Sequence, residues 1–387
     1  MNFELSDEQR MFRDSVKGFA ERHLAADALA RAHSDGFPHD VAKMLAEQGL
    51  LGITIAEEAG GIGGTLMDAV IAIETVAGIC PRSADVIQAG NFGAIRTLAE
   101  YATDDQRKRF LAPLLAGEKL ITVGMTEPEA GSAVTDLVTS ATPDGEGFRI
   151  NGTKVFGTHS ALADYVLVYV RFGPGVGGIG SVVIEKGMDG FTHGQPVRYL
   201  GGEEWAQLYF DNVYVGPDNV ILGEGGFKKQ IAGFNVERIG NSTRSLALGQ
   251  LAFDIARDHA LERKQFGRPL CEFQGLQWKF AELKVQLDAA RLLLYRAATN
   301  ADANVTGGLP SAEETTMAKY ACNQAGFAAA NEAMQVLGAA GYSQDSMVEY
   351  CFRRTRGWQI AGGSLEILKN RLAEIVFDRR FPQRSPK

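Results

Sequence analysis

The hydrophobic residues of this 387-residue chain change their spacing twice, and this change limits the fold more than any other feature. Up to about residue 118 the spacing is helical. In the first segment Met11, Val16 and Phe19 form one stripe behind Ser6, which can cap a helix. Further helices are expected over 39–53, 66–79 and 104–118. The first third of the chain is therefore predicted to be helical.

Between about residues 120 and 222 apolar and polar residues alternate, which is the period of a half-buried strand. Asn151-Gly152 lies between two alternating segments and predicts a tight hairpin turn. Further strands are expected over 164–172, 180–186 and 206–215. The middle third therefore predicts a small, mainly antiparallel β domain.

Helices return after Gly226 and are longer than before, with segments expected over 233–266, 276–303, 311–341 and 364–378. Long antiparallel helices of this kind pack as a bundle. We therefore predict an α+β fold. Its three domains are an N-terminal helical domain over 1–119, a middle antiparallel, β-barrel-like domain over 120–222 and a C-terminal four-helix bundle over 223–387.

Composition excludes several classes of protein. A net charge of -8 argues against a general nucleic-acid binder. The cysteines, Cys80, Cys271, Cys322 and Cys351, lie far apart without a CxxC pair, so neither a metal site nor a disulfide framework is expected. The N-terminal segment lacks the apolar stretch of a signal peptide, and the apolar runs are too short to insert in a membrane. We expect a cytoplasmic protein.

One glycine motif is misleading. Gly175, Gly177 and Gly180 have the G-x-G-x-x-G spacing of a dinucleotide-binding loop. That motif requires a following helix whose N-terminus faces the pyrophosphate, whereas the next segment here is a predicted strand. We interpret the stretch as a flexible hairpin loop.

Three short segments carry polar and aromatic groups of the kind that bind a ligand. MTEPEAGSA, residues 125–133, offers hydroxyls and backbone N–H groups just after a predicted strand. KVFGTHS, residues 154–160, places Phe156 and Thr158 on one face of an extended segment. ERKQFGRPL, residues 262–270, gathers basic residues at a helix end, where one could reach a phosphate. Taken singly, a surface turn, a half-buried strand and charges that offset a helix dipole explain them equally well.

Together the segments resemble the acyl-CoA dehydrogenase family. TEPEAGS matches the family's Thr-Glu-Pro-x-x-Gly-Ser signature, ERKQFG its Arg-x-x-Phe-Gly signature and QVLGAAGY its Gln-x-x-Gly-x-x-Gly segment. The resemblance runs from LSDEQRMFRD through LAEIVFD, nearly the whole chain. It implies FAD held between the β domain and the C-terminal bundle, an acyl-CoA substrate and an electron-transfer flavoprotein as partner. It also implies a homotetramer built as a dimer of dimers.

The family's cofactor contacts carry over onto matching positions. The resemblance implies that the flavin is contacted by Met125, Thr126, Gly131, Ser132, Phe156, Thr158 and Ser364, with Ser132 also facing the thioester ligand. It implies that the FAD of a neighbouring subunit is contacted by Arg263, Phe266, Gln274, Gln335 and Gly338. Ser364 would contact the FAD pyrophosphate at the start of the last helix, where an anion is favoured.

The catalytic base requires a separate argument, because WQIAGGSLEI, residues 358–367, holds no proton-exchanging group before Glu366. In many family members a Glu base occupies the position that is Gly362 here. Members resembling isovaleryl- and long-chain acyl-CoA dehydrogenases instead carry the base in a Glu-Arg pair on an earlier helix. Glu237 and Arg238 match that pair, so we expect Glu237 to abstract the α-proton and Arg238 to contact the substrate. Gly362 would offer its N–H to the thioester carbonyl. The alternative is that Glu237 is a helix-surface residue paired with a basic side chain.

Several departures from the family pattern indicate an unusual substrate, such as a branched, long or bulky acyl chain. LGGEEWAQLYF is about two residues shorter than the family segment, and Glu203, Glu204 and Trp205 add acidity and bulk. Common family residues are also replaced at Ala133, Phe273 and Ala339. The alternatives are a non-catalytic or weakly catalytic partner in a mixed tetramer, a relative acting on carrier-protein-bound acyl groups, and a reductase.

Overall fold

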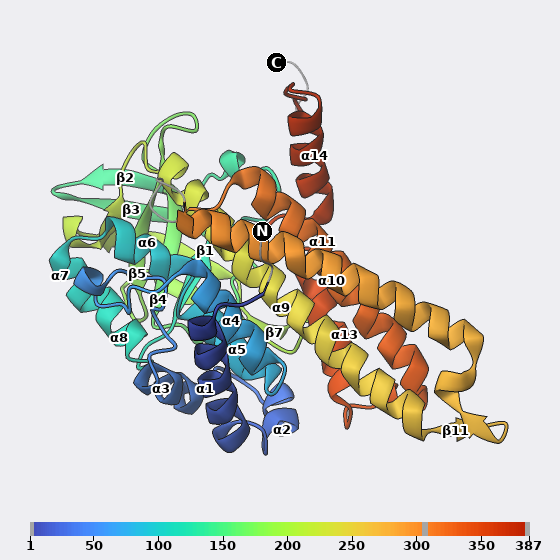
Figure 1. The fold of residues 1–387 in the computed structure, drawn as a ribbon. Helices are drawn as coiled ribbons and strands as arrows, with labels where there is room; N and C mark the ends of the chain where they lie inside the picture. Colours follow the sequence, from blue (N-terminus) through green and yellow to red (C-terminus); the bar gives the residue numbers. More distant parts are fainter. Residues whose placement is uncertain (1–3, 304–308, 384–387) are drawn as a thin grey trace. The chain divides into compact units, whose positions relative to one another are not determined.

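The structure is a computed structural model that describes residues 4–303 and 309–383. The outer ends of the predicted terminal domains, 1–3 and 384–387, lie outside this part. Helices, strands and long helices follow one another along the chain, which confirms the predicted α+β order (Figure 1). The described residues form two compact units: one draws on 4–33, 70–84, 235–303 and 309–383, and the other on 34–69 and 85–234.

The N-terminal third is helical, as predicted. The first helix, α1 (Asp7–His23), begins at Ser6, whose hydroxyl accepts from the N–H of Gln9 at 3.2 Å, while the Gln9 side chain accepts from the N–H of Ser6 at 3.0 Å. This reciprocal cap satisfies two free N–H groups of the first turn. The other helices are α2 (Ala28–Ala32), α3 (His39–Glu47), α4 (Leu66–Ala77), α5 (Pro81–Ala89), α6 (Ala94–Tyr101), α7 (Asp104–Gln106) and α8 (Ala112–Leu115). A π-helical turn, Arg107–Leu111, joins α7 to α8.

The middle third forms an eight-stranded sheet in the order β10-β5-β4-β2-β3-β9-β6, with β1 beside β4. Its strands are β1 (Ile121–Gly124), β2 (Ser140–Asp144), β3 (Gly147–Lys154), β4 (Tyr165–Arg171), β5 (Ile179–Glu185), β6 (Phe191–His193), β9 (Leu208–Val215) and β10 (Val220–Leu222). Among the described residues the pairings of this sheet are antiparallel except β1–β4 and β2–β4, so the mainly antiparallel prediction is confirmed. A separate two-stranded sheet pairs β7 (Val197–Arg198) with β8 (Glu204–Trp205).

Strand β4 shows why the sheet forms here. Its first six residues, YVLVYV, are all buried, which is typical of a strand covered on both faces. Successive side chains point to opposite faces, so Val166 and Val168 pack in one apolar cluster and Leu167 in another. The glycine-rich stretch after β4 leads directly into the antiparallel β5, which confirms a hairpin rather than a nucleotide-binding loop.

The predicted turn at Asn151-Gly152 is wrong, because both residues lie inside β3, and the hairpin turn falls between Asp144 and Gly147. The register against β9 shifts between Ile150 and Gly152, so the glycine belongs to a bulge. A Cβ added at Gly152 would lie 2.5 Å from the Thr139 hydroxyl oxygen, and its φ is 148°. Close packing, not a turn, therefore requires this glycine.

The C-terminal helices are α9 (Phe227–Glu262), α10 (Gln274–Ala303), α11 (Ala312–Leu337), α12 (Ala339–Tyr342), α13 (Met347–Trp358) and α14 (Leu365–Val376). The prediction missed α13 and carried the first long helix too far, since β11 (Lys264–Gln265) pairs with β12 (Arg268–Pro269) after α9 ends. Helices α9 and α11 pack closely: a Cβ at Gly249 would lie 2.5 Å from the Cα of Gly326. Across the described ranges, no helix is long and apolar enough to cross a membrane.

Candidate active site

Two of the predicted ligand segments meet at the ends of β1 and β3. The backbone N–H of Val155 donates to the Thr126 carbonyl at 2.9 Å, and the Thr122 hydroxyl donates to the Thr158 carbonyl at 2.8 Å. These bonds fix the segment after β1 against the segment after β3. The structure thus brings Met125 and Thr126 beside the turn that carries Phe156 and Thr158.

A buried ion pair supports this junction. The Lys154 Nζ donates to the Glu127 carboxylate at 2.7 Å and to the Met125 carbonyl at 3.2 Å, and its side chain is 1% exposed. The carboxylate also accepts the backbone N–H groups of Val138 at 2.6 Å and Thr139 at 2.9 Å. Glu127 therefore has several donors in the interior, and the turn after β1 is anchored through its side chain.

The charges of this pair respond to burial and to each other. Burial lowers the pKa of Lys154 to about 8, although Glu127 opposes the change. Burial tends to raise the pKa of Glu127, but attraction to the Lys154 ammonium and the bonds at the carboxylate outweigh it, so that pKa lies below its usual value. The sequence analysis missed both residues as supports. A lysine at an inward position of a strand was the signal for them.

Phe156 lies in a strained turn. Strand β3 ends at Lys154, and Phe156 has a φ of 60° and His159 a φ of 58°. The expectation that Phe156 and Thr158 share one extended segment is therefore wrong, but both are exposed, two residues apart, and a turn begins at Thr158. A left-handed aromatic residue is rare and costs energy, and such strain gathers at functional sites. Phe156 is 56% exposed, and the centroid of its ring lies 4.4 Å from that of the Trp205 ring.

Gly131 and Ser132 form an open stretch of backbone after the turn. Glu127 and Ala130 form a bridge that closes the turn, and Ser132 is exposed beyond it. A Cβ placed on Gly131 would meet no atom within 4 Å. This backbone is therefore accessible to a bound molecule.

The segment LGGEEWAQLYF, which is shorter than its family counterpart, contributes bulky side chains beside Phe156, as the sequence suggested. Trp205 stacks on Tyr199 at 6.0 Å between centroids. Glu203 is buried, and Glu204 lies 3.7 Å from the Arg198 guanidinium. The aromatic rings therefore form the wall that Phe156 packs against, and one of the two acids is partly compensated by an arginine.

The other predicted groups lie in the unit that draws on residues from Asn235 onward. Gly362 and Gly363 have φ values of 70° and 94°, which confirms the predicted break. Ser364 caps α14 by accepting from the N–H of Ile367 at 3.5 Å. The Arg238 Nε donates to the Gly362 carbonyl at 3.1 Å, and burial lowers the pKa of this guanidinium. The Glu-Arg pair of α9 is thereby tied to the glycine hinge.

Residues expected to reach a neighbouring subunit lie at the surface. Phe266 is 94% exposed at the tip between β11 and β12, with a φ of 52°. Arg263, Gln274, Gln335 and Gly338 are exposed too. Gly338 has a φ of 62° and ends α11, so it starts the turn to α12.

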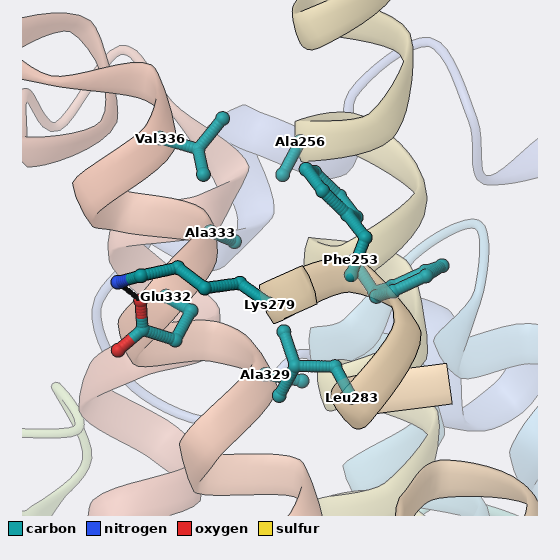
Figure 2. Close-up of a pocket in the computed structure, with 9 residues that line it drawn as sticks. Phe253, Ala256, Lys279, Leu283, Ala329, Glu332, Ala333 and Val336 are labelled. Carbon is teal, nitrogen blue, oxygen red and sulfur yellow. Dashed lines mark hydrogen bonds and ion pairs between the residues drawn. The ribbon is translucent and has the colours of Figure 1, made fainter. Parts of the chain in front are cut away.

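A small apolar pocket lies elsewhere in the same unit, between α9, α10 and α11. Its wall is formed by Phe253, Ala256, Phe280, Leu283, Ala329, Ala333 and Val336. Figure 2 shows the Lys279 side chain crossing its edge to meet the Glu332 carboxylate. Glu237 and Phe253 are sixteen residues apart on α9, which corresponds to about 24 Å along the axis. The pocket contains none of the predicted site residues and is not the candidate site.

Comparisons with known proteins agree with the resemblance. The family models described as "Acyl-CoA dehydrogenase" match the chain in three parts: the N-terminal domain over 6–118, the middle domain over 122–213 and the C-terminal domain over 224–377. A 3-sulfinopropanoyl-CoA desulfinase of Paraburkholderia xenovorans is 33% identical, with 99% of each chain covered. A short-chain-specific acyl-CoA dehydrogenase of Clostridium acetobutylicum is 32% identical over 97% of this chain and 100% of its own. The butyryl-CoA dehydrogenase structure from Megasphaera elsdenii aligns with a TM-score of 0.89 at 30% identity, covering 97% of this chain and 100% of its own.

Proposed function

Because this chain belongs to the acyl-CoA dehydrogenase family of FAD-dependent oxidoreductases that act on CH–CH bonds, we propose that it oxidises an acyl-CoA thioester with Glu237 as the base. Glu237 removes the α-proton of the thioester. The bound flavin supplies the acceptor for the hydride that leaves the β-carbon. The departures from the family pattern favour a branched, long or bulky acyl chain.

The residues of the chain fit this cofactor. The exposed, strained Phe156 and the neighbouring Thr158 suit a flat heteroaromatic ring, because an aromatic face and a hydroxyl become available together. The open backbone at Gly131 allows close approach. The N-terminus of α14 at Ser364 suits a pyrophosphate. Further contacts would come from Met125, Thr126 and Ser132, and from Arg263, Phe266, Gln274, Gln335 and Gly338 of a neighbouring subunit.

One observation carries the assignment of the base: the hydrogen bond from the Arg238 Nε to the Gly362 carbonyl. It ties the Glu-Arg pair to the hinge, where other family members place their carboxylate. Glu237 is half-buried and acts electrostatically on the buried Lys319, unlike a fully solvated surface acid. A base displaced from the hinge to α9 would thus still serve the same substrate carbon.

The hinge also offers a donor to the thioester oxygen. No acceptor for the Gly362 N–H is present in the part of the chain that the structure describes. A backbone N–H aimed at this oxygen stabilises the negative charge that develops there when the α-proton leaves. Arg238 and Ser132 would complete the contacts with the thioester ligand.

We propose that subunits assemble into a homotetramer, a dimer of dimers, and pass electrons to an electron-transfer flavoprotein. Trp278, Val285 and Leu292, which are spaced by seven on α10, are 60%, 69% and 46% exposed. Such a stripe fits a helix seam in which another copy packs. Together with the exposed Phe266, it supports a surface that a second subunit covers.

Replacing Glu237 with Gln tests the base, because the amide cannot accept the proton but keeps the size of the side chain. We expect the variant to retain the flavin absorbance and to reduce an artificial dye about 10²–10⁴-fold more slowly. Glu21→Gln, which changes an exposed carboxylate of α1, serves as control and should have normal turnover. Near-normal dye reduction by Glu237→Gln would remove Glu237 from the proposal.

A second candidate function follows from the 33% identity with the desulfinase. Anaerobic flavin bleaching with straight, branched and cyclic acyl-CoA thioesters measures dehydrogenation, and sulfite release from 3-sulfinopropanoyl-CoA measures the alternative. Bleaching by a branched or cyclic thioester without sulfite release supports the dehydrogenase. Sulfite release without bleaching favours the desulfinase, and protein that stays colourless with added FAD favours a non-catalytic partner subunit. Turnover only of a carrier-protein thioester favours a relative with a carrier-bound substrate.

A further inference from the structure

A lysine with no role in the proposed chemistry lies in the interior of the C-terminal bundle. Lys319 is 0% exposed, and its neighbours on α11 include the fully buried Ala318 and Cys322. Burying an ammonium group is costly unless specific partners receive it. The contacts of Lys319 must therefore explain why its ammonium group is buried.

The contacts of Lys319 lead to the end of α13. Its Nζ donates to the carbonyl of Trp358, the last residue of that helix, at 3.0 Å. The Asn323 amide donates to the same oxygen at 2.6 Å and to the Asn241 side chain at 3.3 Å. Carbonyl groups at a helix C-terminus lack partners within the helix, so a cation and an amide stabilise this end. Two side chains of α11 thus fix α13 where it leads into the glycine hinge.

The same lysine lies against the hinge itself. A Cβ built on Gly362 would be 3.4 Å from the Lys319 Cε and 3.9 Å from the Asn241 amide nitrogen. The Arg238 guanidinium holds the carbonyl of Gly362. The hinge backbone is therefore held by Lys319 of α11 and Arg238 of α9.

The charged groups around Lys319 come from several helices. Burial and, to a lesser extent, the Arg238 charge of α9 lower the pKa of Lys319 to about 7, while Glu237 of α9 opposes the change. Other charged side chains near these elements are Arg244 of α9 and Arg354 of α13 over the Trp358 ring, Lys369 of α14 over the Tyr320 ring, and Arg291 of α10, which is paired with Glu74.

We propose that Lys319 is a positioning residue for the base: its side chain fixes the glycine hinge that Arg238, the neighbour of Glu237 on α9, also holds, and its positive charge favours the ionised Glu237 carboxylate. This inference rests on the proposed role of Glu237. An opposite charge nearby lowers the pKa of a carboxyl group. The base acts when it is deprotonated, so activity rises with pH through the Glu237 pKa. Removing the Lys319 charge raises that pKa and moves the acid limb of the kcat/KM profile to higher pH.

Two neutral variants and one charged variant test this effect in the FAD-loaded enzyme. Lys319→Gln can still donate to the Trp358 carbonyl but has no charge. Lys319→Met removes both the hydrogen-bond donor and the charge. We expect each to move the acid limb of kcat/KM upward by about one pH unit or more. Lys319→Arg keeps the charge and should leave the limb within about 0.3 units, by the same argument. Lys17→Met, an exposed lysine of α1, is the matched control and should change nothing.

A second variant separates the charge from the packing. Asn323→Ala removes the other donor to the Trp358 carbonyl without changing any charge, so it should lower kcat or leave it unchanged while the acid limb stays in place. An unchanged limb in Lys319→Gln, or an equal shift in Asn323→Ala, would overturn the inference. If neither neutral variant retains its flavin, Lys319→Arg decides between the outcomes. A shift of the acid limb by a full pH unit, although the charge is retained, contradicts the inference. An acid limb that does not shift supports it.

Failure of this inference differs from failure of the proposed base. If Glu237→Gln has normal turnover, the proposed function fails, and the acid limb of the kcat/KM profile does not report the ionisation of Glu237. If Glu237→Gln is inactive while Lys319→Gln keeps the wild-type limb, only the role of Lys319 is lost.

Discussion

Replacing Lys154 with Met would remove one partner of the buried ion pair that anchors the turn after β1. The two side chains are 1% and 4% exposed, so the Glu127 charge would remain in the interior without its cation. Breaking a buried pair in this way costs about 3–5 kcal/mol. Two backbone N–H groups still donate to Glu127, which places the expected loss at the lower end, about 3 kcal/mol.

The loss is measurable as a thermal shift. A unit of 150–250 residues loses about 2–4 °C of melting temperature for each kcal/mol, so Lys154→Met should melt about 6–12 °C below the wild type. Both proteins are measured with the same excess of FAD, because ligand binding raises the melting temperature by mass action. Lys119→Met is the control, since Lys119 bonds to Asp164 at 2.8 Å but is 45% exposed. Exposed pairs contribute little, so its shift should stay within about 2 °C.

A double variant tests whether the carboxylate has its own role. Well-packed apolar residues often replace a buried ion pair without loss. Here Lys154→Met/Glu127→Leu should not recover stability, because the N–H groups of Val138 and Thr139 would lose their acceptor. Each buried donor left without a partner costs about 1–3 kcal/mol. Recovery in the double variant would show that these backbone bonds contribute nothing.

The pH dependence gives a further signature. The pKa of Lys154 falls from 10.5 to about 8 on folding, so between these values the unfolded chain binds more protons. Stability should therefore rise as pH increases from about 8 to 10.5, and this rise should be absent in Lys154→Met. The lowered pKa of Glu127 acts at the other end: its contribution is complete above the usual value of 4.5 and is lost as pH falls through the lowered value.

The reasoning is refuted if Lys154→Met melts within about 2 °C of Lys119→Met at pH 7, since a buried and an exposed pair would then contribute equally. It is also refuted if the wild type and Lys154→Met change in parallel between pH 8 and 10.5. Either outcome would mean that Lys154 is not a buried cation in the folded protein.

Two further predictions concern the sheet and the assembly. Gly152→Ala should destabilise by about 1–3 kcal/mol, because its Cβ would lie 2.5 Å from the Thr139 hydroxyl oxygen; Gly216→Ala, which meets no atom within 4 Å, is the control in the same thermal melt. Trp278→Glu should yield smaller species than the wild type by size-exclusion chromatography with light scattering, whereas Met11→Glu, 74% exposed on α1, should not. An unchanged assembly in Trp278→Glu would exclude this stripe from the subunit interface.

The spacing of the hydrophobic residues predicted most of the helices and strands, because that spacing reflects which side chains are buried. The all-buried strand β4 and the capped α1 contain their own evidence in consecutive residues. The Asn151-Gly152 turn failed because a glycine required by packing against Thr139 resembles a glycine required by a turn. Helix α13 was missed because its stripe is short, with Val348, Cys351 and Thr355 buried among charged residues.

The residues of the candidate site also fall into those that the sequence singled out and those that it did not. Motif matching predicted groups for ligand contact, such as Phe156 and Ser364, and these stay predictions. It did not identify Lys154 or Lys319, whose partners lie 27 and 39 residues away in the chain. A charged residue in an apolar pattern signals burial, but it does not say which partner compensates the charge.

The difference between the residues that the motifs singled out and the buried residues that they missed has a physical cause, which also explains the glycine hinge. A group that is proposed to bind a ligand must be accessible before the ligand arrives. Phe156 is exposed, and its strained backbone needs support from elsewhere. Supporting charges act strongly only where water is excluded, so Lys154 and Lys319 are buried. At Gly362 both requirements meet in one backbone unit: the carbonyl is held by Arg238, and the N–H has no acceptor in the described chain. Gly362 has no side chain, and the Lys319 Cε lies 3.4 Å from where its Cβ would be. In the proposed mechanism the hinge can therefore contribute a rigid donor while the carboxylate comes from α9.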